Sequence, residues 1–300
     1  MNTSSNCVIC LLKKEHLFLK KENKEDNGYL KEVMDVIDKN CNDQPPTWLL
    51  TKIQELREKY YNTRDDYTEE KHKFNNLILN IEDKLEKKIE ESEDPIYEGL
   101  KYASIGNYID FGTLQDVNEE KLLNMIDEAS KREIDKETYK LFKQDLSTAK
   151  ELAYLVDNCG EIVFDKLLVK QLRKHYPDLK VTVVVRGEDT INDATMVDAV
   201  EVGLDKICDC VGNGNGYPST IMSETCEPTK KIINRADIII AKGQGNFEGF
   251  YESKLNTYYM FLVKCDYFVR KFGMERFSTV FKREKDIVTY LWGIKWKSWF

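Results

Sequence analysis

The hydrophobic pattern of the N-terminal half is that of amphipathic helices. From residue 29 to about residue 130 the chain is dense in Lys, Glu, Asp and Leu, and its apolar residues recur three or four positions apart. One such series is Leu49, Ile53, Leu56 and Tyr60. The pairs Pro45-Pro46 and Asp94-Pro95 separate the helical stretches, because proline disrupts a helix from within. We therefore predict a mainly helical N-terminal half.

After Lys150 the pattern changes to short β-branched or apolar runs that alternate with amphipathic stretches. The runs that predict strands are 152–156, 181–185, 206–211 and 236–241. The stretches that predict helices are 161–174, 194–202 and 229–235, whereas 258–265 fits either a strand or a helix. The alternation predicts an α/β fold with a mainly parallel, doubly wound sheet. We place a mainly helical domain at residues 1–145 and the α/β core at residues 146–300.

Composition and charge limit the kinds of partner, and the cell compartment, that we expect for this protein. A chain of 300 residues with 41% hydrophobic content can bury a substantial core, and its net charge of -8 argues against a nucleic-acid partner. No run approaches the roughly 18 apolar residues of a membrane span, and the first residues lack the pattern of a signal peptide. These features predict a cytoplasmic protein with neither a membrane nor a nucleic-acid partner.

Two of the eight cysteines, Cys7 and Cys10, form a C-x-x-C pair. Such a pair can chelate a soft metal or form a redox couple. A structural zinc site needs further ligands, however, and the sequence contains no second C-x-x-C. Metal binding and ordinary thiols therefore both stay open for this pair.

Polar residues collect directly after each predicted strand, at the sheet edge where α/β folds bind ligands. The segments are 157–161, 186–193, 212–216 and 242–246. Side-chain oxygens of Asp157, Asn158 and Asp193 suit Mg²⁺ or Mn²⁺, and cobalt or nickel is also compatible. Lys242, beside two glycines, offers an ammonium group and backbone N–H groups to a phosphoryl group. The sequence thus predicts a cation next to an oxyanion.

A purely structural explanation stays open for the same residues. Asp157 or Asn158 could cap the helix at 161–174, and Asp193 could cap the next helix. Capping does not explain why Lys242 directly follows an apolar strand. The pattern Gly243-x-Gly245 adds little, because it lacks the third glycine and the downstream acid of a dinucleotide site.

Four segments resemble the metal-dependent damage-control phosphatases, formerly the domain-of-unknown-function 89 superfamily. They are 157–165 (DNCGEIVFD), 192–199 (NDATMVDA), 236–248 (ADIIIAKGQGNFE) and 106–112 (GNYIDFG). The N-terminal C-x-x-C is similar to that of the stand-alone microbial branch of the family. The resemblance implies a Rossmann-like three-layer α/β/α core with an N-terminal helical domain. It also implies hydrolysis of phosphate esters of small metabolites, such as sugar phosphates or damaged phosphometabolites.

The resemblance assigns roles to individual residues. Asp157, Asn158 and Asp193 match the metal ligands, and Lys242 matches the lysine that contacts phosphate. The groups expected close to the substrate are Glu161, Asn192, Gln244, Asn246, Asn107 and Asp110. Cys7 and Cys10 are expected at a second metal site, which Cys226 or Cys265 would complete.

We therefore predict a phosphohydrolase that needs a divalent cation, with manganese, magnesium, cobalt or nickel as candidates and a small phosphorylated metabolite as partner. Direct attack by water and a covalent intermediate on Asp157 both fit this chemistry. Two other functions stay open. Proteins that resemble the family are associated with S-adenosylmethionine-dependent carboxyl methyl transfer, which does not require a cation at these residues. A non-catalytic metal- or metabolite-binding protein would bind without turnover.

Overall fold

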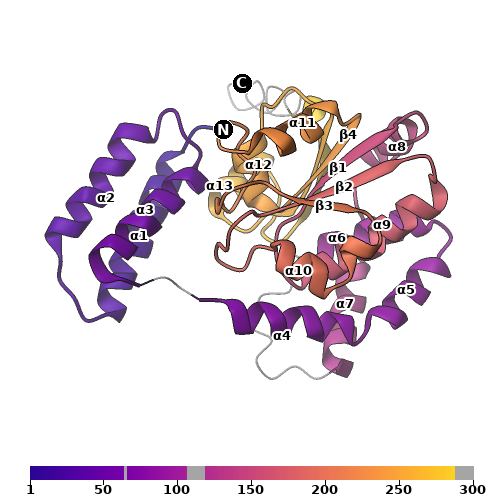
Figure 1. Cartoon of the computed structure of the whole chain (residues 1–300), viewed down its shortest axis with the longest axis horizontal. Helices are drawn as coiled ribbons and strands as arrows, with labels where there is room; N and C mark the ends of the chain where they lie inside the picture. Colours follow the sequence, from indigo (N-terminus) through magenta and orange to yellow (C-terminus); the bar gives the residue numbers. More distant parts are fainter. Residues whose placement is uncertain (64–65, 107–118, 288–300) are drawn as a thin grey trace.

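A computed structural model describes residues 1–63, 66–106 and 119–287 (Figure 1). The helices before the sheet are α1 (Ser5–Lys21), α2 (Asn27–Asn40), α3 (Pro46–Tyr61), α4 (Thr68–Leu79), α5 (Glu82–Glu90), α6 (Pro95–Ile105), α7 (Glu119–Ser130) and α8 (Lys136–Leu146). The strands are β1 (Glu151–Leu155), β2 (Lys180–Val185), β3 (Asp209–Gly212), β4 (Ile238–Lys242), β5 (Thr257–Leu262) and β6 (Thr279–Arg283). The helices among them are α9 (Glu161–His175), α10 (Met196–Glu201), α11 (Glu227–Arg235), α12 (Gly243–Phe250) and α13 (Asp266–Phe272).

The six-stranded sheet has the order β3-β2-β1-β4-β5-β6, and all neighbouring pairs are parallel except β5 and β6. This is the order of a doubly wound Rossmann sheet, here with an antiparallel edge strand. The strand order reverses between β1 and β4. The carboxyl ends of these two strands therefore frame the crevice in which such sheets bind ligands.

The side chains of β1 show why helices cover both faces of the sheet. Leu152 and Tyr154 point to one face and belong to the core that contains α6 and α9. Ala153 and Leu155 point to the other face and pack with residues of α12 and α13. Because successive side chains alternate and all four are buried, both faces need a helical cover. The predicted three-layer α/β/α core is confirmed.

The helical half divides into two parts with different packing (Figure 1). Helices α1 to α3 enclose their own small core, which contains Tyr29, Val33, Leu49 and Ile53. Helices α4 to α8 instead contribute to the core under the sheet, and α6 packs along α9. The division at residue 145 stays a prediction. We propose that α1 to α3 are the separate unit.

The sequence located most elements but left some out. Segment 258–265, which fitted a strand or a helix, overlaps strand β5. The predicted strand at 206–211 begins only at Asp209, because residues 204–206 form a 3-10 turn. Helices α12 and α13 and strand β6 were not predicted. In the part of the chain that the structure describes, no helix is both long and apolar enough to cross a membrane.

Candidate active site

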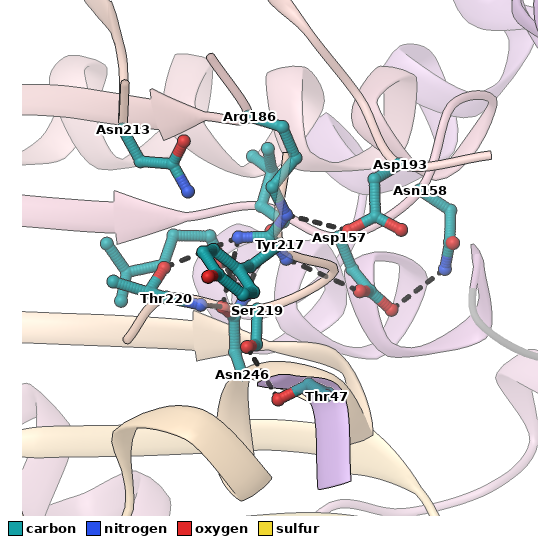
Figure 2. A network of polar contacts seen from close by, with 12 residues as sticks. Thr47, Asp157, Asn158, Arg186, Asp193, Asn213, Tyr217, Ser219, Thr220 and Asn246 are labelled. Atoms are coloured by element: carbon teal, nitrogen blue, oxygen red, sulfur yellow. Dashed lines mark hydrogen bonds and ion pairs between the residues drawn. The ribbon is translucent and has the colours of Figure 1, made fainter. Parts of the chain in front are cut away.

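The loops after β1 and β2 hold the three predicted metal ligands side by side (Figure 2). Asn158 and Asp193 form an antiparallel bridge between these loops. The Ala194 N–H donates to the Asp157 carbonyl at 2.8 Å, and the Cys159 N–H donates to the Asn192 carbonyl at 2.9 Å. Backbone hydrogen bonds thus fix Asp157, Asn158 and Asp193 next to one another.

These three side chains do not cap the helices that follow them. The N-cap of α9 is Gly160, which has a φ of 71° and provides no side-chain cap. The N-cap of α10 is Thr195, which forms a capping box with Asp198. The capping explanation is therefore wrong for Asp157, Asn158 and Asp193, and their convergence calls for another explanation.

The two carboxylates are buried close to further negative charge. Asp157 is 8% exposed and Asp193 4%. Burial and the neighbouring carboxylates of Asp193 and Glu161 raise the pKa of Asp157 to about 7, against the opposing effect of Arg186 and Lys264. The Asn158 side chain donates to Asp157 Oδ2 at 2.8 Å and to Glu161 Oε2 at 3.2 Å. A bound cation would relieve the repulsion in this cluster.

Gly243 makes room for the Asp157 carboxylate. It begins α12 with a φ of 80°, and a Cβ atom at this position would overlap Asp157 Oδ2. Only glycine combines this conformation with this close approach. The glycine after Lys242 is therefore required for steric reasons, which the sequence pattern alone did not reveal.

Replacing Gly243 by alanine is expected to lower turnover by about 10²-fold, because the added methyl group displaces the Asp157 carboxylate. The matched control is Gly203→Ala. Gly203 has a φ of 73°, but no atom of the described residues lies within 4 Å of the place that the new methyl group would occupy, so this variant carries the backbone strain without the clash. Steady-state kinetics of both purified variants check the prediction. Equal activity of the two variants would contradict it.

Lys242 is fully buried, and its Nζ lies 2.5 Å from Glu161 Oε1 and 2.7 Å from Asp165 Oδ1. Asp165 also accepts a hydrogen bond from the Tyr154 hydroxyl at 2.7 Å. Sequence reasoning missed Asp165, although it lies four residues after Glu161 on the same face of α9. Both ammonium contacts are carboxylates, so direct contact with phosphate fits this position of Lys242 poorly. That contact stays a prediction.

Lys264 is a further cation near the site, and sequence reasoning missed it. It follows β5 at the carboxyl edge of the sheet and is exposed, and its charge acts to lower the pKa of Asp157. Its backbone N–H donates to Gln244 Oε1 at 3.0 Å. The signal was the lysine directly after an apolar run, but the ambiguity of segment 258–265 concealed it.

The other predicted residues have different surroundings. Asn246 is fully buried, and its side chain forms hydrogen bonds with backbone groups of the protein. Gln244 forms hydrogen bonds with the Lys264 backbone N–H and the Cys265 thiol. Asn192 is half-buried beside Asp193. Asn107 and Asp110 lie outside the described residues.

The C-x-x-C pair lies on α1, where Cys7 is half-buried and Cys10 is exposed. Burial raises the pKa of the Cys7 thiol, which favours its protonated form. Among residues 1–63, 66–106 and 119–287, no three His, Cys, Asp or Glu side chains form a group arranged to hold a metal ion. A metal site at Cys7 and Cys10 stays a prediction.

The donor set at Asp157, Asn158 and Asp193 fits a hard divalent cation. It combines two carboxylates with one amide, the oxygen ligands that Mg²⁺ and Mn²⁺ accept. The buried charged groups of this cluster are Asp157, Glu161, Asp165, Asp193, Lys242 and Arg186. When all are ionised, these described side chains carry an excess of negative charge, which a divalent cation would balance.

Comparisons with known proteins find relatives that match most of this chain. A protein of Methanocaldococcus jannaschii, MJ0202, is 30% identical over 283 residues, covering 90% of this chain and 91% of the relative. A damage-control phosphatase of Archaeoglobus fulgidus is 30% identical over 287 residues, covering 91% and 96%. The fold matches a crystal structure of a DUF89 family protein, PH1575 from Pyrococcus horikoshii, with a TM-score of 0.80 and 24% identity over 95% of this chain and 99% of that one.

A family model extends the match to nearly the whole described chain. The model of the damage-control phosphatase ARMT1-like domain matches residues 3–280, which include α1 to α3, strands β1 to β5 and all four loops of the candidate site. With the Rossmann-type strand order and the converging acidic loops, this chain belongs to the damage-control phosphatase ARMT1-like family.

Proposed function

We propose that this protein is a divalent-cation-dependent phosphatase that hydrolyses phosphate monoesters of small metabolites. One observation carries the proposal: Asp157, Asn158 and Asp193 converge at the switch point of the sheet, and the helices that follow them have other N-caps. The relative from Archaeoglobus fulgidus is named a damage-control phosphatase, which supports the same reaction class.

The residues divide the chemistry as follows. Asp157, Asn158 and Asp193 would hold the cation, which supplies Lewis-acid activation when bound. The Glu161 carboxylate accepts from the Asn158 amide and from Lys242, so it orients both groups. Because these acids are buried, little water contacts them, and their electrostatic interactions are stronger than they would be in water.

We assign the cationic contact with the phosphate to Lys264 and a positioning role to Lys242. Lys264 is exposed at the carboxyl edge of the sheet, whereas Lys242 is enclosed by two carboxylates. An exposed ammonium group can meet a phosphate oxygen without losing an existing buried partner.

Lys264→Met is expected to raise the KM for a phosphate ester by about 10-fold with little change in unfolding free energy, because it removes one charge-assisted contact at the surface. Lys206→Met is the matched control, since Lys206 is exposed near the opposite end of the sheet. Saturation kinetics and urea unfolding check both variants. An unchanged KM in Lys264→Met would remove Lys264 from the site.

The metal-free protein is expected to lose stability as the pH rises from about 4 to about 7. The pKa of Asp157 is raised from 3.8 to about 7 in the folded state, so folding favours the proton and loses that contribution when the carboxyl ionises. The loss is on the order of a few kcal/mol. Urea unfolding between pH 5 and pH 8 in chelator measures it. An equally steep fall in metal-free Asp157→Asn would contradict the assignment to Asp157.

The substrate class is tested by measuring phosphate release from a panel of sugar phosphates and a generic aryl phosphate with Mn²⁺ present. Turnover of at least one monoester is expected. Binding of these compounds without any phosphate release would favour the non-catalytic alternative.

A further inference from the structure

Arg186 lies at the centre of the polar network around the metal ligands, and the proposed reaction gives it no role so far (Figure 2). It directly follows β2, and its side chain is 1% exposed. A buried guanidinium group is costly unless its donors are matched, so its contacts indicate what it is for.

One side of the guanidinium group faces both acidic ligands. Arg186 Nε donates to Asp193 Oδ2 at 2.7 Å, and Nη2 lies 3.9 Å from Asp157 Oδ1. Within the described part of the chain, the buried Nη2 has no hydrogen-bond partner. The arginine therefore leaves one donor unmatched while it stays within reach of both carboxylates.

The Nη1 side of the guanidinium group is held by hydrogen bonds to two buried polar side chains. Nη1 donates to Asn246 Oδ1 at 3.2 Å and to Thr220 Oγ1 at 3.4 Å. Asn246 is itself fixed, because its side chain accepts from the Thr220 N–H at 2.7 Å and donates to the Val156 carbonyl at 2.9 Å. These two contacts come from the loop after β3 and from helix α12, so two separate elements fix the position of the Arg186 side chain.

The backbone of Arg186 is held as well. Its N–H donates to the Ala194 carbonyl at 2.9 Å, and Arg186 and Thr195 form a parallel bridge. The residue is thus tied at its backbone to the segment that follows Asp193 and at its side chain to Asp193 itself. A planar fork with several fixed donors can hold two carboxylates in a defined orientation, which a lysine ammonium cannot do.

We infer that Arg186 is a positioning residue that holds Asp193 and Asp157 in the arrangement from which both bind one divalent cation. This inference rests on the proposed metal-dependent function. Arg186 acts through the two carboxylates and does not touch the substrate. Asn246 and Thr220 contribute indirectly, because they keep the guanidinium group in place.

The test measures Mn²⁺ affinity by calorimetric titration of the metal-free wild type and of metal-free Arg186→Lys. Lysine keeps the charge but loses the fork, so the Mn²⁺ affinity is expected to fall by about 10- to 100-fold. The lost phosphatase activity should return as the Mn²⁺ concentration is raised. Arg57→Lys is the matched control, since Arg57 is paired with Glu15 at 2.6 Å in the α1 to α3 unit. It should lower stability without changing Mn²⁺ affinity.

A second variant covers the case in which Arg186→Lys does not fold. Thr220→Val removes only the hydroxyl contact with Arg186 Nη1 and is expected to weaken Mn²⁺ binding by a smaller factor, about 3- to 10-fold. Wild-type affinity in the folded variants, or an activity loss that persists at saturating Mn²⁺, would overturn the inference. Failure of the wild type itself to bind Mn²⁺ would instead overturn the metal dependence on which the inference rests.

Discussion

Asp157→Asn is expected to lower kcat/KM for a phosphate ester by at least about 10³-fold, because the variant loses a charged oxygen ligand at the place where charge must be stabilised. The asparagine keeps the shape of the side chain, so the fold is expected to survive. Asp193→Ala should cause a comparable loss. Circular dichroism and steady-state kinetics of the purified variants measure the two effects separately.

The control for this prediction is Asp189→Asn. Asp189 lies on the same loop as Asp193, but its side chain is 73% exposed and paired with Lys71 at 3.0 Å, so activity should stay near that of the wild type. In chelator at pH 8, Asp157→Asn should also be more stable than the wild type, since it removes a carboxylate whose ionised form burial disfavours. Full activity in either Asp157→Asn or Asp193→Ala would contradict the site assignment.

Lys242→Met is expected to lower the unfolding free energy by about 3–5 kcal/mol, because it leaves Glu161 and Asp165 without the ammonium group that they share. Burial and the Glu161 charge already raise the pKa of Asp165 to about 6, even with Lys242 present. Removing the lysine therefore leaves a buried carboxylate pair that can avoid repulsion only by taking up a proton.

Urea unfolding of Lys242→Met at neutral pH measures this loss. The double variant Lys242→Met with Glu161→Gln should recover part of the stability, because one of the two opposed carboxylates is then neutral. A Lys242→Met protein that is as stable as the wild type but inactive would show that Lys242 contacts the substrate, as the sequence suggested.

The parts of the site that could be predicted from the sequence are those governed by strand ends. Parallel strands place their carboxyl ends at one edge, so Asp157, Asn158 and Asp193 could be brought together from their positions after apolar runs alone. The register of β1 and β2 then makes the contact specific, because the two loops meet in the bridge between Asn158 and Asp193.

The parts that could not be predicted depend on which buried charges find one another. Nothing in the sequence states that Lys242 meets Asp165, or that Arg186 reaches across to Asn246, because these partners are 77 and 60 residues apart and pair only in the packed core. Lys264 was missed for a different reason. The apolar run before it has no clear period, so the position of its strand end was ambiguous.

Metal-restored phosphate release is the measurement that tests the central proposal most directly. The wild type and Asp157→Asn are treated with chelator and assayed on sugar phosphates and an aryl phosphate, before and after Mg²⁺, Mn²⁺, Co²⁺ or Ni²⁺ is added separately. We expect turnover that chelation removes, that a divalent cation restores in the wild type, and that stays absent in Asp157→Asn. No turnover with any cation would contradict a phosphatase and favour methyl transfer or a binding role. Equal turnover with and without a cation would contradict the metal dependence.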